Sequence, residues 1–149
     1  MTEVLFYHLE TRKLHEVLPG LLARSLERGW RVVVQTQLPE RVEALNSLLW
    51  TWRDDSFLPH GAAGDGDEAR QPIWLTAGDD APNDANIRFL VDGATAATLN
   101  GLDRAVYLFN GADEAERLSA RAAWKAAAEA GHDVTYWRQT PEGKWEKQG

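Results

Sequence analysis

The chain of 149 residues contains no cysteine, and this absence removes several classes of protein. Disulfides and thiolate metal sites are excluded, and a chain without them fits the reducing cytoplasm, where we expect this protein. No stretch approaches the roughly 18 consecutive apolar residues of a membrane-spanning helix. The first ten residues, MTEVLFYHLE, have neither a basic region nor a small-residue cleavage site, so we expect no signal peptide.

The sequence also lacks the short motifs that identify many α/β enzymes. There is no G-x-x-x-x-G-K-[ST] phosphate loop, because the glycines at 61, 64 and 66 are followed by acidic residues and not by a lysine. The four histidines form no H-E-x-x-H pair. Three aspartates gather after the middle of the chain, but their spacing does not match a calcium-binding loop: Asp79, Asp80 and Asp84. We therefore expect no metal and no cofactor.

One enzymatic alternative stays open at His60. Asp54 and Asp55 precede this histidine and would be able to orient its imidazole for base catalysis, while the Gly-rich segment 61–68 follows it. On this reading the chain is a small α/β enzyme that binds a nucleotide or catalyses hydrolysis. No G-x-S-x-G nucleophile motif accompanies His60, and the acidic loop would repel a phosphate. These absences favour a histidine that hydrogen-bonds a loop.

Positive charge is scarce in one part of the chain. The net charge is −7, and residues 54–85 carry all of it, with eight acidic residues against Arg70 alone. Nucleic-acid binding depends on attraction between basic side chains and phosphates. Binding of DNA or RNA over a broad face is therefore disfavoured unless a compact basic patch exists elsewhere, and we expect no direct contact with nucleic acid.

What the sequence does contain is an alternation of strand-like and helical periods. β-forming apolar runs predict strands, and a helical spacing of apolar residues predicts helices. Pro19 lies inside the first helical stretch and leaves two starts open for that helix, one at residue 14 and one near Leu18. The strands are expected at 3–9, 30–36, 73–76, 87–93, 104–111 and 132–139, and the helices at 14–28, 39–52 and 112–131. This order predicts a single α/β domain over 1–149, a three-layer sandwich whose mainly parallel sheet has helices on both faces. Residues 58–72 read as a loop, and residues 138–149 as a C-terminal extension or hairpin.

The last helix carries a basic stripe with an aromatic ring in it. At about 100° per residue, Arg117, Arg121 and Trp124 lie on one face, with Lys125 at its edge. A solvated helix face is one interpretation of this stripe. The other is a pocket for an acidic peptide that ends in an apolar side chain, because arginine pairs with carboxylates and an apolar wall would hold the side chain.

The stretch WTWRDDSFLPHG at 50–61 combines aromatic rings with three consecutive charges. Turns do not require large rings, and core elements do not usually contain runs of charge. Aromatic residues are favoured where a protein meets a partner. The stretch is thus either the end of a core helix or a surface that another subunit contacts, with Trp52 expected inside.

Several stretches resemble one known family, in order along nearly the whole chain. They are FYHL at 6–9, RGWRVVVQT at 28–36, LLWTWRDDSFLPHG at 48–61, FLVDG at 89–93 and AAWKAAAEAGHDVTYW at 122–137. The family is that of the chi subunit of the bacterial DNA polymerase III holoenzyme. The resemblance implies a non-catalytic adaptor in the clamp-loader complex. A second reading stays open, in which the chain is a helicase-associated or repair factor that binds the acidic tail of single-stranded-DNA-binding protein.

The resemblance also implies two binding surfaces. Chi-like proteins bind the acidic C-terminal tail of single-stranded-DNA-binding protein, which ends in Pro-Phe, and the positions for this tail fall on Phe109, Arg117, Arg121 and Trp124. They also bind the small psi subunit, and the positions for psi or another clamp-loader subunit fall on Trp50, Phe57 and Pro59. The family's fold is a doubly wound α/β sheet, in agreement with the periodicity.

Overall fold

A computed structural model describes most of the chain. It covers residues 2–10, 13–51, 60–62, 71–78, 83–95, 99, 101–142 and 144–148, without the side chains of residues 50 and 51. Everything below concerns these residues.

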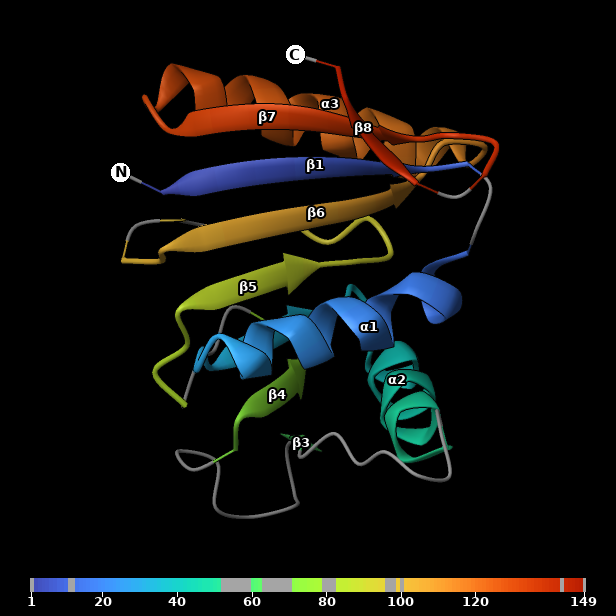
Figure 1. The fold of residues 1–149 in the computed structure, drawn as a ribbon, viewed down its shortest axis with the longest axis vertical. Helices are drawn as coiled ribbons and strands as arrows, with labels where there is room; N and C mark the ends of the chain where they lie inside the picture. Colours follow the sequence, from blue (N-terminus) through green and yellow to red (C-terminus); the bar gives the residue numbers. More distant parts are fainter. Residues whose placement is uncertain are drawn as a thin grey trace.

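Within these residues, eight strands form one sheet in the order β3-β4-β2-β5-β6-β1-β7-β8 (Figure 1). Neighbouring strands pair in parallel, except for β7 and β8, which are antiparallel. The strands are β1 (Glu3–Leu9), β2 (Val32–Gln35), β3 (His60–Ala62), β4 (Ile73–Thr76), β5 (Ile87–Leu90), β6 (Arg104–Asn110), β7 (Asp133–Gln139) and β8 (Trp145–Lys147). The central strands β2, β4 and β5 are buried almost throughout, as parallel strands covered on both faces should be.

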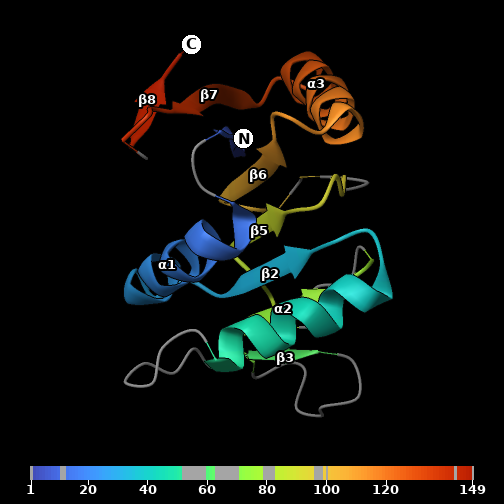
Figure 2. The same ribbon diagram turned by 90° about the vertical axis from the view of Figure 1, so that its right-hand side faces the viewer.

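Three helices cover the sheet from its two sides (Figure 2). Helices α1 (Leu14–Glu27) and α2 (Pro39–Thr51) pack on one face, where they share a core with residues such as Val34, Leu45 and Ile73. Helix α3 (Glu114–Glu129) packs on the other face, against Val4, Phe6 and other residues of β1 and β6. The predicted three-layer α/β sandwich with a mainly parallel sheet is therefore confirmed.

Helix α1 begins at the first residue of the predicted stretch 14–28 and not near Leu18, the alternative start that Pro19 left open. It starts at Leu14 and runs through Pro19, which is buried. The side chain of Glu16 accepts a hydrogen bond from the backbone nitrogen of Lys13 at 2.9 Å, which satisfies one donor of the first turn. The turn before the proline is also held by packing of Leu14 and Val17 against the core. These interactions offset the missing backbone donor of Pro19.

Two short strands, β3 and β8, form the two edges of the sheet. Residues 60–62 form β3 beside β4, inside a segment expected to be a loop throughout. Three residues of strand are too short to give a periodicity signal in a Gly-rich segment. At the other edge, residues 145–147 turn back and pair with 137–139 as an antiparallel hairpin, one of the two predictions for the end of the chain.

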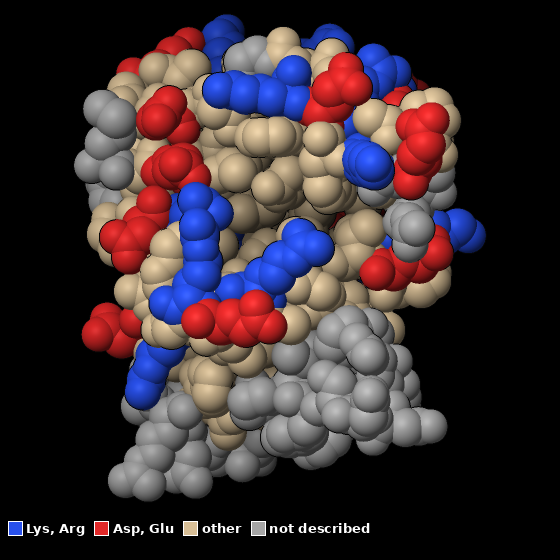
Figure 3. Space-filling view, in the orientation of Figure 1, with Lys and Arg blue, Asp and Glu red and all other residues tan. Residues whose placement is uncertain are grey.

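The face that carries α1 is hollowed between that helix and the sheet (Figure 3). A cavity of about 450 Å³ lies there, and its lining includes Arg24, Arg28 and Arg104 together with Glu27. Arg104 is already paired with Glu3 at 2.7 Å. Of the helices in the described ranges, none is long and apolar enough to cross a lipid bilayer.

Candidate functional site

Helix α3 is fixed against the sheet by its ends and by small residues along one side. Asp113 caps its first turn and accepts a hydrogen bond from the backbone nitrogen of Glu116 at 3.0 Å. Gly131 follows its last turn with a φ of 83°, a conformation that glycine adopts without strain. Ala120, Ala123 and Ala127 are the buried residues of the helix. Because these side chains are small, the helix axis lies close to the strands.

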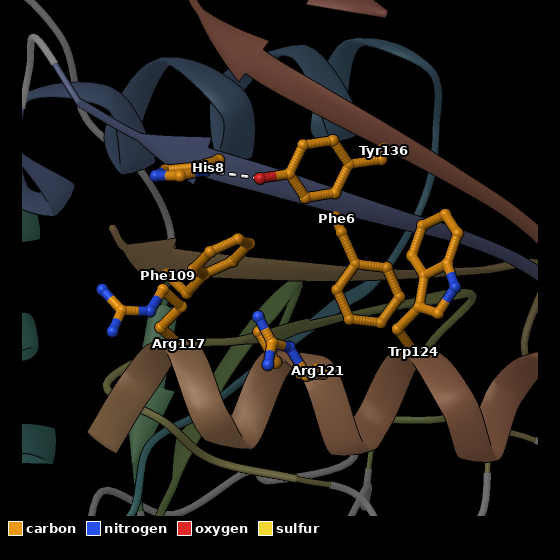
Figure 4. Close-up of a pocket in the computed structure, with 8 residues that line it drawn as sticks. Phe6, His8, Phe109, Arg117, Arg121, Trp124 and Tyr136 are labelled. Carbon is orange, nitrogen blue, oxygen red and sulfur yellow. Dashed lines mark hydrogen bonds between the residues drawn. The ribbon is translucent and has the colours of Figure 1, made fainter. Parts of the chain in front are cut away.

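A cavity of about 210 Å³ opens between α3 and strands β1, β6 and β7 (Figure 4). All four residues for which the sequence predicted a shared binding role line this one cavity. The complete lining is Phe6, His8, Phe109, Arg117, Ala120, Arg121, Trp124 and Tyr136. We refer to it below as the α3 pocket.

One part of the α3 pocket is built from aromatic rings. Trp124 packs against Phe6 and Tyr136, with ring centroids 5.3 and 6.0 Å apart. Phe6 is itself stacked on Tyr107 at 4.7 Å, and Phe109 lies 6.3 Å from Tyr136. Phe6 and Phe109 are buried, whereas Trp124 and Tyr136 are half-buried. The rings form an apolar wall that is supported from behind by the core.

Two guanidinium groups stand over this wall from the surface of α3. Arg117 and Arg121 are both exposed, one turn apart on the helix. Arg117 donates a hydrogen bond to the backbone oxygen of Gly111 at 3.2 Å, which holds its side chain toward the start of the helix. Neither arginine forms an ion pair with another described residue. Their charges are therefore available to an anionic ligand.

The floor of the α3 pocket contains a polar pair that joins two strands. His8 of β1 and Tyr136 of β7 share a hydrogen bond, with 2.5 Å between Nδ1 and the hydroxyl oxygen. The imidazole also lies against the ring of Phe109, at a centroid distance of 4.9 Å. Burial lowers the pKa of His8 below its ordinary value and raises the pKa of the Tyr136 hydroxyl. Both groups are consequently uncharged near neutral pH.

An ion pair between Glu10 and Arg138 lies beside His8 of the α3 pocket. Oε1 of Glu10 lies 3.6 Å from Nε2 of His8 and 2.6 Å from Nη2 of Arg138. The hydrogen bond from Arg138 lowers the pKa of the Glu10 carboxyl, so this group is ionised over a wide pH range. The negative charge of Glu10 is thus already paired and does not stand alone beside the two arginines of α3.

Sequence reasoning missed half of this lining. Phe6 and His8 lie within the stretch FYHL, and their spacing of two places both on the same face of β1. This alternation indicates that Phe6 and His8 share one face of β1, but it does not indicate which helix covers that face. Tyr136 is 128 residues from His8 in sequence, and only the pairing of β1 with β7 brings the two together.

The residues predicted to face a second subunit are not placed by the structure. Phe57 and Pro59 lie outside the described residues, and Trp50 is described only by its backbone in the last turn of α2. This prediction therefore stays a prediction.

The enzymatic alternative centred on His60 finds little support in the residues that are described. His60 is 8% exposed in β3, and its Nε2 lies 2.7 Å from Oδ1 of Asn46. A buried imidazole already bonded to an amide offers a substrate little access. Asp54, Asp55 and residues 63–68 are outside the described ranges. Within those ranges, no group of three His, Asp or Glu side chains is arranged to hold a metal ion.

Comparison with known proteins gives two agreeing matches. The family model for the DNA polymerase III chi subunit, HolC, matches residues 1–135. A curated protein of Rickettsia prowazekii (strain Madrid E), named "Probable DNA polymerase III subunit chi", is 26% identical over 99 residues, which is 66% of this chain. The matched region spans 60% of that relative's length.

The match to the family model covers β1, β6 and α3, and it ends within β7, one residue before Tyr136. On this evidence, the chain belongs to the DNA polymerase III chi subunit family.

Proposed function

We propose that this chain is a non-catalytic accessory subunit of the replicative DNA polymerase that binds the acidic C-terminal tail of single-stranded-DNA-binding protein in the α3 pocket. The observation that carries the proposal is that Phe109, Arg117, Arg121 and Trp124 line one cavity. They come from two elements, β6 and α3, and the resemblance implied a shared binding role for them.

The chemistry of the α3 pocket suits a peptide that is acidic and ends in an aromatic residue. Trp124 and Phe109 offer ring surfaces for a terminal phenylalanine, and aromatic pairs are favourable beyond the area they bury. Arg117 and Arg121 are unpaired among the described residues and are able to bind carboxylates with charge-assisted hydrogen bonds. A chain of net charge −7 would otherwise repel such a peptide, so the attraction has to come from a local patch.

Weak to moderate affinity is expected for this contact. A short flexible peptide loses conformational entropy when it becomes ordered on a surface, which offsets part of the interaction free energy. Both arginines are exposed, so salt should weaken binding, since charges in water are screened over about 8–10 Å at physiological ionic strength.

A titration with a synthetic peptide of several aspartates ending in Pro-Phe tests the proposal. We expect Arg121→Ala to weaken binding at least about threefold, because a charge-assisted hydrogen bond is lost. Arg24→Ala is the matched control: it removes the same charge from an exposed arginine on the opposite face of the sheet and should change the affinity little.

Two results would count against the assignment of this site. One is equal loss of affinity in Arg121→Ala and Arg24→Ala, which would indicate a general charge effect. The other is undiminished binding of a peptide that lacks the final phenylalanine, which would leave the aromatic wall without a role.

The proposal includes a second contact that links the chain to the clamp loader. Trp50, Phe57 and Pro59 are proposed to bind a psi-like or other clamp-loader subunit, on the basis of the resemblance in WTWRDDSFLPHG. Family membership supports association with the polymerase. Isolation of the chain from native lysate and identification of what remains bound would distinguish a clamp-loader partner from a helicase or repair factor.

A further inference from the structure

His8 occupies a position in the α3 pocket that no role described above explains. It lines the cavity beside both arginines, yet its side chain is only 13% exposed. Its ring is held on three sides, by the hydroxyl of Tyr136, the ring of Phe109 and the backbone at Gly111. A methyl group added at Gly111 would overlap the imidazole, so the fit on that side is close. The ring is therefore a fixed part of the pocket.

Charged groups surround this imidazole from three elements. Glu10, at the end of β1, favours the protonated ring, whereas Arg138 of β7 and Arg117 of α3 oppose it. Burial is the largest influence and lowers the pKa of His8. Burial raises the pKa of the neighbouring Tyr136, whose hydroxyl stays neutral. In the free protein the ring of His8 is therefore mainly neutral at pH 7.

An acidic ligand would reverse this balance. Carboxylates bound to Arg117 and Arg121 would lie at the same cavity as His8 and would compensate the two guanidinium charges. An opposite charge within about 4–6 Å favours the protonated form of a histidine. Protonation is compatible with the existing contact, because Nδ1–H is then able to donate to the oxygen of Tyr136.

We propose that His8, positioned by Tyr136, is a further residue of the α3 pocket whose protonation adds a positive charge to those of Arg117 and Arg121, so that acidic peptides bind more tightly as the pH falls below neutrality. This inference rests on the proposed function of the pocket and names a residue that regulates it.

The direction of the effect follows from linkage. If the bound peptide raises the pKa of His8, the complex takes up a proton, and affinity rises as the pH falls from the pKa of the complex to the lower pKa of the free protein. Above both values the affinity is constant. Aspartate side chains titrate near pH 3.9 and stay ionised throughout a measurement between about pH 8 and about pH 5.5.

The test is a titration of the same acidic Pro-Phe peptide at about pH 8 and about pH 5.5. We expect the parent protein to bind about two- to fivefold more tightly at the lower pH, the gain given by one additional partly screened charge pair. His8→Gln removes the titrating group and should bind equally at both values. His15→Gln is the matched control, because His15 is exposed on α1 and should leave the pH dependence intact.

A second measurement needs no variant of the pocket. The ring-proton NMR signals of His8 in the parent protein, followed against pH with and without the peptide, should give a higher pKa in the complex. This readout remains valid if His8→Gln fails to fold.

The outcomes separate this inference from the function on which it rests. Arg121-dependent binding with no pH dependence, or with the same dependence in His8→Gln, overturns the role of His8 and leaves the proposed function standing. An unchanged pKa of His8 on addition of peptide also overturns the role of His8 alone. If no peptide binds at about pH 8 or at about pH 5.5, both the role of His8 and the proposed function are overturned.

Discussion

Gly111 is the residue on which the position of His8 depends most directly. It follows β6 and precedes α3, and its backbone accepts the hydrogen bond from Arg117. No side chain fits there beside the imidazole. Glycine is thus required here because the imidazole of His8 lies close to the backbone. Arg117 is held by the same residue through its hydrogen bond.

We predict that Gly111→Ala displaces the imidazole of His8 and destabilises the fold by about 1–3 kcal/mol, the usual cost of inserting a methyl group into a packed site. Urea unfolding measures the change. Gly20→Ala is a suitable control, because an added methyl group there meets nothing within 4 Å. An unchanged midpoint in Gly111→Ala, or an equal loss in the control, would show that the contact is not tight.

We also predict a pH dependence of stability that has His8 as its source. Because burial lowers the pKa of His8 in the fold, the unfolded chain binds the proton more readily. The stability from the neutral ring is present above the unfolded pKa of about 6.5 and is lost as the pH falls through the lower folded value. The melting temperature of His8→Gln should therefore fall less between about pH 7.5 and about pH 5.5 than that of the parent. Parallel curves would contradict this.

At the scale of elements, α3 determines the width of the α3 pocket. The helix packs through alanines, and Ala120 lies on both the packed side and the cavity wall. Small residues let the helix lie close to β1 and β6, which brings Arg117 and Arg121 over the rings of Phe6 and Phe109.

We predict that Ala123→Leu destabilises the protein by about 1–3 kcal/mol and weakens peptide binding, because the larger side chain forces α3 away from the sheet. Ala122→Leu is the matched control on the exposed side of the same helix. Leucine has a helix propensity close to that of alanine, so Ala122→Leu should leave the stability and the peptide affinity almost unchanged. Thermal unfolding and the peptide titration are measured for both variants. Equal effects in the two would mean that packing of α3 against the sheet does not determine the width of the pocket.

The elements were largely predictable from sequence, whereas the pocket was predictable only in part. Arg117, Arg121 and Trp124 were found because the helical period places near neighbours in sequence on one face. His8 and Tyr136 were missed because no local sequence pattern indicates the order of parallel strands in a sheet. Only the position of β1 between β6 and β7 brings these two residues together. The alternative start of α1 near Leu18 was wrong because tertiary packing of Leu14 and Val17 outweighs the local preference of Pro19.

At the scale of the whole molecule, the two faces of the sheet differ in what they offer a ligand. The cavity of the α1 face has three arginines and one glutamate in its lining, and one of these arginines, Arg104, is paired with Glu3 (Figure 3). The α3 face places two arginines that form no ion pair with a described residue beside an aromatic wall (Figure 4). An acidic peptide that ends in an aromatic residue is therefore expected to select the α3 face even though the chain as a whole is negatively charged.

We predict that replacement of both Trp50 and Phe57 by alanine removes a co-purifying subunit and leaves the tail peptide bound with unchanged affinity. The expectation follows from the resemblance, which assigns the two sets of residues to different partners. Unfolding by Trp50→Ala alone would contradict it, because truncation of a core aromatic costs about 3–5 kcal/mol and would identify this ring as core.

In the proposed complex, the terminal ring of the acidic peptide lies against Trp124 in the α3 pocket. This contact is measured by a double-mutant cycle, with Trp124→Leu in the protein and removal of the final phenylalanine in the peptide. If the two rings touch, each change costs less binding free energy in the presence of the other, with a coupling free energy of about 0.5–1.5 kcal/mol. Additive costs, with no coupling, would show that the two rings do not touch.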